Sequence, residues 1–155
     1  MTEQFLSFML DGEMYAMTLQ PVREIIEYPG ETAVPMMPPC IRGVINLRGA
    51  VVPVLDLSVR FGRGASQIGR RSCIVIVETA GLVIGVLVDA VNTVLDIDPA
   101  EVEPPPSFGA RLRIDFIAGV GKWNGRLVIL LNTETVLSPE EIAAVDSLAE
   151  QGGLS

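Results

Sequence analysis

Short runs of apolar residues alternate with polar ones along most of the chain, and their spacing predicts β-strands rather than long helices. Two hairpins are indicated, with turns at Asp11-Gly12 and Ala80-Gly81, because such dipeptides between apolar runs favour tight turns. One further strand is predicted after each hairpin. The strands predicted from this pattern are Phe5–Leu10, Glu13–Met17, Val22–Tyr28, Cys73–Val77, Leu82–Val88 and Val91–Ile97.

A longer unit occurs twice: a glycine, a short apolar run, a second glycine turn, a strand and a possible helix cap. Gly43 to Phe61 aligns with Gly119 to Leu137 without a gap. The matched pairs are Gly43 with Gly119, Val44 with Val120, Gly49 with Gly125, Val52 with Val128, Leu55 with Leu131 and Asp56 with Asn132. Aspartate and asparagine share the same capping chemistry. Internal repetition of this kind predicts a repeated structural unit.

The segments between the predicted strands are irregular. Pro29–Pro39 and Pro104–Pro106 are proline-rich, and each proline removes a backbone donor and restricts the residue before it. Gly62–Arg71 has no apolar period and is interpreted as a loop that joins two halves. The order of elements is the same in both halves. Each half offers about five short strands, which favours an all-β fold of two pseudo-symmetric five-stranded barrels, because closure removes exposed edges.

One helix is predicted near the C-terminus, over residues 139–150. Ser138 is its expected N-cap, Pro139 suits the first helical position, and Glu141 completes a capping box. The apolar residues of this segment share one face, so we expect the helix to pack against a barrel. These residues are Ile142, Val145, Leu148 and Ala149.

Composition limits the partners and the compartment. The 155 residues carry 11 basic and 19 acidic side chains, and a net charge of −8 argues against nucleic acid or an anionic membrane as the main partner. The chain has no apolar run of membrane-span length and no signal peptide at its start, so a cytoplasmic protein is expected. Its 49% apolar residues indicate a dense β core, or apolar surface kept for a partner.

The side chains present do not indicate an enzyme. The sequence has no histidine, so Cys40 and Cys73 lack the usual partner that activates a thiol and are interpreted as free cysteines. The acidic pairs between residues 96 and 103 stand beside prolines, which favours a solvated loop over a catalytic or metal site. Gly119–Lys122 lacks the first glycine and the Ser or Thr of a phosphate loop. We therefore predict no catalytic residue, no metal and no cofactor.

Several stretches together resemble the CheW family of chemotaxis coupling proteins. They are FLSFMLDGEMYAM at Phe5–Met17, VREI at Val22–Ile25, GVINLRGAVVPVLDL at Gly43–Leu57 and GVLVDAVNTVL at Gly85–Leu95. The resemblance implies two intertwined barrels like Src-homology-3 domains in a single domain. It places the first barrel at about 13–78 and the second at about 1–12 plus 79–137, so that Phe5–Leu10 joins the second barrel and Cys73–Val77 the first.

The resemblance also implies a non-enzymatic adaptor role. Such proteins couple the cytoplasmic tip of methyl-accepting chemotaxis receptors to the CheW-like regulatory domain of the histidine kinase CheA. They reach the membrane only through receptor arrays. The positions that match receptor-binding ones are Val22, Glu24, Gly43, Arg48 and Val94, with Leu6, Leu19 and Val91 in a groove between the barrels. Those that match the kinase-facing end are Val51, Cys73 and Ile74.

Each of these residues also has a purely structural interpretation. The aliphatic ones are ordinary core residues of barrel strands, and Gly43 is a turn glycine. Glu24 and Arg48 are more informative, because a charge inside an apolar run is not fully buried unless it is paired. Two other functions stay open: a coupling protein of a non-flagellar array that controls surface motility or a second messenger, and a small-ligand-binding β-barrel.

Overall fold

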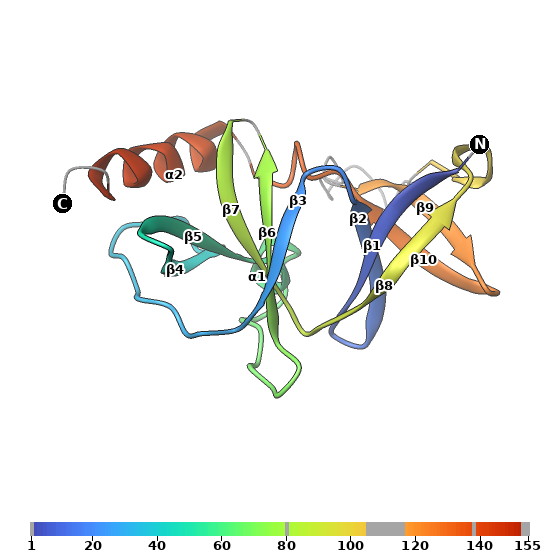
Figure 1. Cartoon of the computed structure of the whole chain (residues 1–155), viewed down its shortest axis with the longest axis horizontal. Helices are drawn as coiled ribbons and strands as arrows, with labels where there is room; N and C mark the ends of the chain where they lie inside the picture. Colours follow the sequence, from blue (N-terminus) through green and yellow to red (C-terminus); the bar gives the residue numbers. More distant parts are fainter. Residues whose placement is uncertain (1, 80, 105–116, 138, 153–155) are drawn as a thin grey trace.

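The computed structural model describes residues 2–79, 81–104, 117–137 and 139–152, which form two five-stranded sheets and a C-terminal helix (Figure 1). The first barrel has the strand order β3-β6-β7-β5-β4, and its strands are β3 (Val22–Glu27), β4 (Ile41–Leu47), β5 (Ala50–Asp56), β6 (Cys73–Thr79) and β7 (Leu82–Val88). The second barrel has the order β8-β1-β2-β10-β9, and its strands are β1 (Glu3–Leu10), β2 (Glu13–Thr18), β8 (Ala90–Ile97), β9 (Ile117–Trp123) and β10 (Arg126–Leu131). The predicted fold class is confirmed.

The two barrels are built on one plan but neither is closed by a continuous ladder. In the first barrel the segment after β3 reaches β4 only through the bridge between Thr32 and Val44. The second barrel has the equivalent bridge between Glu103 and Val120. Each barrel also holds one short parallel pairing, β5 with β7 and β10 with β2. The repeat seen in the sequence is therefore a repeat of backbone pairing.

The halves of the sequence exchange their hairpins. The hairpin β1-β2 pairs with β8 and β10 of the second half, and the hairpin β6-β7 pairs with β3 and β5 of the first half. The predicted positions of β1 and β6 agree with this arrangement. The predicted boundaries at residues 13 and 79 do not, because they cut both hairpins and assign β2 and β7 to the wrong barrels. A two-residue turn such as Asp11-Gly12 holds its two strands side by side, so a hairpin stays whole.

The first glycine of each repeat is required by the bridge beside it. A Cβ atom on Gly43 would lie 2.2 Å from the carbonyl oxygen of Thr32, and one on Gly119 would lie 2.7 Å from that of Glu103. Both distances are far below a normal contact. The matched glycines therefore let the bridging segment cross the sheet at close range.

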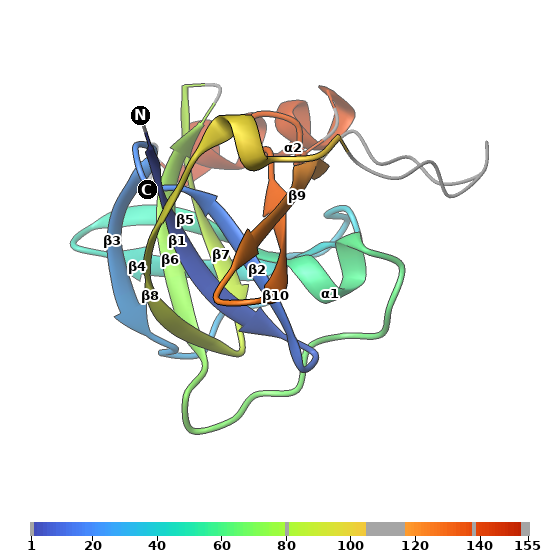
Figure 2. The same cartoon turned by 90° about the vertical axis from the view of Figure 1, so that its right-hand side faces the viewer.

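Apolar side chains form one cluster inside each barrel and a larger one between the barrels. The interior of the first barrel includes Ile74 and Ile76, and that of the second includes Phe5 and Leu95. The cluster between the barrels draws on both, and its members include Leu6, Phe8, Leu10, Met17, Leu55, Val75, Val77, Val86 and Val145. The exchanged hairpins supply most of it. The two barrels therefore share one core, and they lie side by side along the long axis of the molecule (Figures 1 and 2).

Two helices and one 3-10 turn complete the part of the fold that the structure describes. Asp56 caps α1 (Leu57–Arg60), as predicted, by accepting hydrogen bonds from the backbone N–H groups of Ser58 and Val59. The helix α2 (Pro139–Gly152) packs on β5 of the first barrel and buries Val145. A 3-10 turn, η1, spans Pro99–Glu101. Neither helix in the described ranges is long and apolar enough to cross a membrane.

Some predicted features fall on positions outside the described residues. They are the turn residue Ala80, the prolines 105 and 106, the cap Ser138 and Gly153. The side chains of Leu148 and Ala149 are likewise outside the description.

Candidate functional site

The only two charged residues in the predicted receptor-binding set form an ion pair on the surface. Glu24 lies on β3 and Arg48 on the turn between β4 and β5, at the two opposite edges of the first sheet. Arg48 Nη1 donates to Glu24 Oε1 at 3.1 Å, and Arg48 Nη2 donates to the other carboxylate oxygen. The hydrogen bond from Arg48 lowers the pKa of Glu24. The pair thus spans the open edge of the first barrel.

Arg48 holds a backbone position that does not favour arginine. It has φ +50° and is followed by Gly49 at +88°, which makes the β4–β5 connection a type I′ turn. Its counterpart Asn124, in the β9–β10 turn, also has φ +50°. Asparagine tolerates this left-handed conformation better than arginine does. The first repeat therefore carries a mostly exposed arginine, with 70% of its side chain accessible, at a position where the second repeat carries the residue that suits the turn.

The edge strands β3 and β8 lie on one side of the molecule, on either side of the line where the barrels meet (Figures 1 and 2). Val94 is 41% exposed. Leu19, Val22 and Val91 are half-buried against the cluster between the barrels. We call these four residues, together with Ile25, the seam residues.

Ile25 is a surface residue that the sequence analysis missed. It is 42% exposed, nearly the same as Val94. The two are equivalent, because Ile25 pairs with Val75 of β6 and Val94 pairs with Leu6 of β1, the matching strand. A signal existed in the sequence: aligning Val22–Tyr28 with Val91–Ile97 places Ile25 opposite Val94.

Two residues of the predicted receptor-binding set lie inside the protein. Leu6 is only 3% exposed and belongs to the cluster between the barrels. Gly43 is buried under the Thr32 carbonyl. Both support the surface around them, and neither presents a side chain to a partner.

The three residues of the predicted kinase-facing end do not form one patch. Ile74 is fully buried inside the first barrel, while Val51 and Cys73 are half-buried. Strand β7 separates β5 from β6. Cys73 pairs with Val88 at the end of β7, whereas Val51 precedes Val54, which pairs with Gly85. Val51 and Cys73 therefore lie near opposite ends of β7.

A buried polar network stabilises the loops around the first barrel. Asp56 is fully buried and accepts hydrogen bonds from Ser66 N at 2.9 Å, Ser66 Oγ at 2.7 Å and Arg42 Nη1 at 3.0 Å. Arg42 Nε also donates to Glu31 at 3.0 Å. Burial alone would raise the pKa of Asp56, but the hydrogen bonds from Ser66 and Arg42 outweigh it and lower the pKa. The network ties the 29–40 and 62–69 segments to the sheet that carries Glu24 and Arg48.

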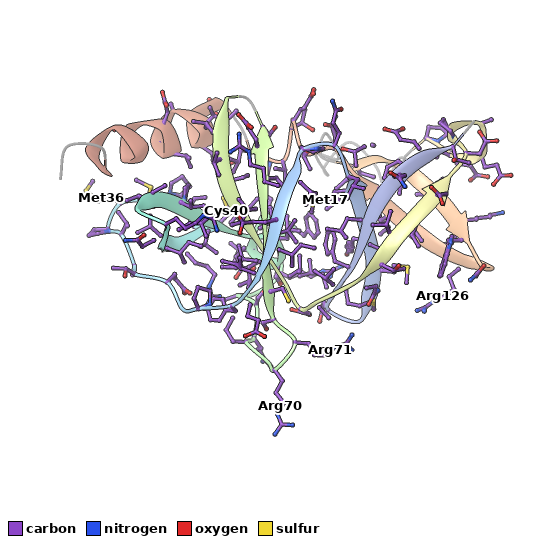
Figure 3. The ribbon with its side chains drawn as sticks, viewed as in Figure 1. Met17, Met36, Cys40, Arg70, Arg71 and Arg126 are labelled. Atoms are coloured by element: carbon purple, nitrogen blue, oxygen red, sulfur yellow. The ribbon has the colours of Figure 1, made fainter. Side chains whose placement is uncertain are left out.

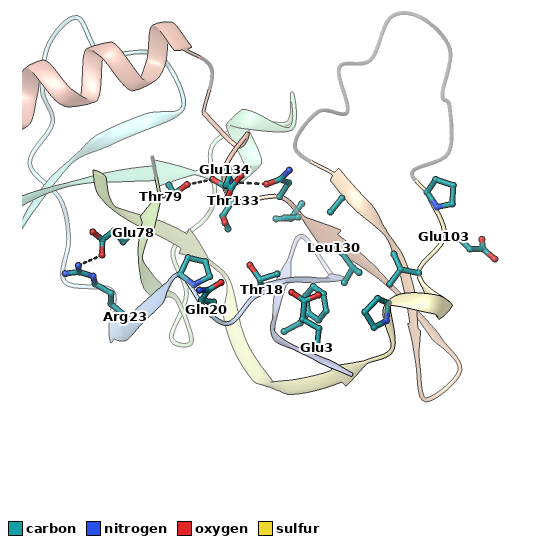
Figure 4. Close-up of a pocket in the computed structure, with 18 residues that line it drawn as sticks. Glu3, Thr18, Gln20, Arg23, Glu78, Thr79, Glu103, Leu130, Thr133 and Glu134 are labelled. Atoms are coloured by element: carbon teal, nitrogen blue, oxygen red, sulfur yellow. Dashed lines mark hydrogen bonds and ion pairs between the residues drawn. The ribbon is translucent and has the colours of Figure 1, made fainter. Parts of the chain in front are cut away.

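A cavity of about 1370 Å³ lies where both barrels contribute residues (Figure 4). Its acidic residues are Glu3, Glu78, Glu103 and Glu134, and Arg23 forms an ion pair with Glu78. The other polar contacts shown are internal: Thr79 Oγ1 donates to the Thr133 carbonyl, and Glu134 N donates to Asn132 Oδ1. Among the described residues, no group of three or more cysteine, aspartate or glutamate side chains could hold a metal ion.

Comparison with known proteins gives one consistent result. The model of the CheW-like domain family matches residues 4–141. Two curated relatives are both named chemotaxis protein CheW. The one from Klebsiella aerogenes is 34% identical over 96% of this chain and 89% of its own length, and the one from Bacillus subtilis is 33% identical over 89% and 88%. Protein FrzA of Myxococcus xanthus is 30% identical over 92% and 90%. The crystal structure of the scaffolding protein TtCheW from Thermoanaerobacter tengcongensis superposes with a TM-score of 0.82 at 33% identity, covering 91% of this chain and 96% of that one.

Proposed function

This chain belongs to the family of CheW-like domains, and from that premise we propose that it is an adaptor of chemotaxis signalling. In this role it holds the cytoplasmic tip of methyl-accepting receptors and the histidine kinase CheA in a fixed relative geometry. It performs no chemistry of its own and needs no cofactor. It resides in the cytoplasm and is recruited to receptor arrays at the membrane through its partners.

The Glu24–Arg48 ion pair is the observation that carries this proposal. Arginine stands in a turn position that suits asparagine, and most of its side chain is exposed. The conformation of the turn therefore does not explain why an arginine is present at position 48. The planar guanidinium of an arginine can leave a carboxylate of its own chain and bind a carboxylate or the helix-end carbonyls of a partner instead. Its aliphatic part can pack on apolar surface at the same time. We assign Arg48 and Glu24 to the receptor contact.

The seam residues supply the apolar part of the same contact. A receptor tip is a helical hairpin, and a helix lying on an apolar surface is a recurrent mode of recognition. Val94 and Ile25 offer exposed aliphatic side chains on matching edge strands, and Leu19, Val22 and Val91 lie behind them. Leu6 and Gly43 support this surface from below. The kinase contact is assigned to the surroundings of Val51 or of Cys73, with Ile74 as buried support.

The test is Arg48→Asn, which copies the second repeat. The variant keeps a residue suited to the left-handed turn, so its melting temperature should equal that of the wild type. It should abolish receptor-coupled activation of CheA in a mixture of receptor-bearing vesicles, kinase and this protein. Arg70→Asn is the matched control, because Arg70 points into solvent from the 62–72 loop (Figure 3) and should leave activation unchanged. Wild-type activation by Arg48→Asn would refute the assignment.

A second candidate is a coupling protein of a non-flagellar array that controls surface motility or a second messenger. The similarity to Protein FrzA of Myxococcus xanthus supports it. The contact surfaces would be the same, and only the receptors and the kinase would differ. Pull-down of the tagged chain from its source cell separates the two candidates, because each predicts a different co-purified kinase.

A further inference from the structure

The outer face of the second barrel carries apolar residues that no helix in the described ranges covers. Strands β2, β9 and β10 line a cavity of about 460 Å³ there, with Met14, Ile117, Val120, Leu127 and Ile129 as its apolar residues. Leu127 is 64% exposed, which is unusual for a leucine in a strand. Met14 belongs to the buried cluster inside the second barrel, and we call the other four residues, Ile117, Val120, Leu127 and Ile129, the open face.

The equivalent face of the first barrel is covered by a helix. The sequence repeat matches Ile117, Val120, Leu127 and Ile129 with Ile41, Val44, Val51 and Pro53. Val52 and Val54 point into the first barrel, so Val51, Pro53 and Leu55 form the outer face of β5. The helix α2 packs on β5 and buries Val145 against the core. Ile41 is 6% exposed and Pro53 is buried, whereas their counterparts Ile117 and Ile129 are only half-buried.

The helix on the first barrel is also held by polar contacts. Glu141, in the first turn of α2, accepts a hydrogen bond from the Cys40 thiol at 3.1 Å and lies 3.8 Å from Arg60 Nε. Burial and the neighbouring Glu141 carboxylate raise the pKa of Cys40 to about 12, so the thiol stays protonated as the donor. The outer face of the first barrel therefore binds a helix that has an apolar stripe and an acidic first turn.

The charges around the open face differ from those of the covered face. Lys122 pairs directly with Leu127 across β9 and β10, and Arg126 borders the cavity. Their counterparts in the first repeat are the neutral Asn46 and Ala50. Within the described ranges neither Lys122 nor Arg126 has an ion-pair partner. Arg126 points away from the barrel at the end of the molecule opposite α2 (Figures 1 and 3). Glu13 also lines the cavity, but its carboxylate already pairs with Arg63 and accepts a hydrogen bond from the Tyr15 hydroxyl. We call Lys122 and Arg126 the basic rim.

We propose that the open face is a docking site for an acidic amphipathic helix of a partner protein, bound as α2 is bound on the first barrel. The apolar stripe of that helix would cover Leu127 and its neighbours, and its carboxylates would meet Lys122 and Arg126. A second copy of this chain is a poor occupant, because its own α2 already buries its apolar side on β5. The inference goes beyond the adaptor role and does not depend on it, since the seam residues lie on β3, on β8 and in the β2–β3 connection.

The probe is a synthetic peptide of residues 138–152, which has four carboxylate side chains and the apolar stripe that fits the first barrel. Added to the full-length ¹⁵N-labelled chain, whose own α2 occupies the first site, it should cause saturable amide shifts on β9 and β10. Leu127→Glu should weaken this binding at least about tenfold. Ile68→Glu is the matched control and should bind the peptide as the wild type does, because Ile68 is a 44% exposed aliphatic residue in the 62–72 loop, away from β9 and β10.

Three results with the peptide would overturn the proposal. They are the absence of saturable shifts up to about 1 mM peptide, shifts confined to β4 and β5 through displacement of α2, and unchanged affinity of Leu127→Glu. A peptide with its acidic residues changed to lysine should bind more weakly, which tests the basic rim. Shifts on β9 and β10 that grow with protein concentration without peptide would identify a second copy as the occupant and would equally overturn a partner helix.

Discussion

The two copies of the repeated unit, residues 43–61 and 119–137 together with the residue before each, share a backbone conformation but differ in the interactions of their side chains. In the first copy Arg48, Arg42 and Asp56 take part in ion pairs, and α2 covers the outer face. In the second copy the matching residues are Asn124, Ala118 and Asn132, and no helix in the described ranges covers the outer face. The repeated features are those that the backbone requires, such as Gly43 and Gly119. Residues that differ between the copies are therefore the ones to examine for function.

The largest effect on stability should come from replacing Asp56 with asparagine, the residue at the matching position of the second copy. Asp56→Asn keeps a capping side chain but leaves Arg42 without its buried carboxylate partner, so the free energy of unfolding should fall by about 3 kcal/mol. The reverse change in the second copy, Asn132→Asp, is the control. Asn132 is half-buried, and its side-chain oxygen accepts a hydrogen bond from Glu134 N that a carboxylate can also accept, so we expect a change within about 0.5 kcal/mol. Urea denaturation measures both, and equal losses would contradict a special role for the first copy.

The same residue predicts how stability depends on pH. The folded-state pKa of Asp56 lies below its ordinary value of 3.8, so its ionised form stabilises the folded state. This contribution is complete above about pH 4 and is lost as the pH falls through the folded-state value. Stability measured between about pH 5 and pH 2 should therefore fall less steeply for Asp56→Asn than for the wild type. If the stability of both proteins fell in parallel with pH, other carboxylates would account for the loss of stability at acidic pH.

The smallest of these effects concerns the edge strands. Val94→Asp should weaken receptor binding about tenfold, because it puts a charge without a partner into an apolar contact. Binding to the kinase should change less. The side chain is 41% exposed, so the melting temperature should stay close to that of the wild type. Ile25→Asp tests the equivalent position of the first barrel. An equal loss of both partners in a normally folded Val94→Asp protein would argue against a separate receptor surface.

The sequence by itself determined the local elements and the repeat. Dipeptides such as Asp11-Gly12 and Asn124-Gly125 specify tight turns because their residues tolerate positive φ, and apolar runs of strand length follow them. The strand positions, the Asp56 cap and the C-terminal helix follow from such short-range chemistry. The resemblance to a known family added the exchange of β1 and β6 between the barrels. The barrel boundaries that the resemblance implied were nevertheless wrong for β2 and β7.

The tertiary structure alone decided which distant residues meet. The parallel pairings of β5 with β7 and of β10 with β2 span only three residue pairs each, too few to leave a pattern in the sequence. The partnership of Glu24 with Arg48 and the network around Asp56 join segments whose spacing along the chain follows no period. The separation of Val51 from Cys73 depends on β7 lying between their strands. The apolar stripe of α2 does not specify which of the two equivalent faces the helix covers, and the contacts of Glu141 with Cys40 and Arg60 that favour the first barrel are visible only in the folded structure.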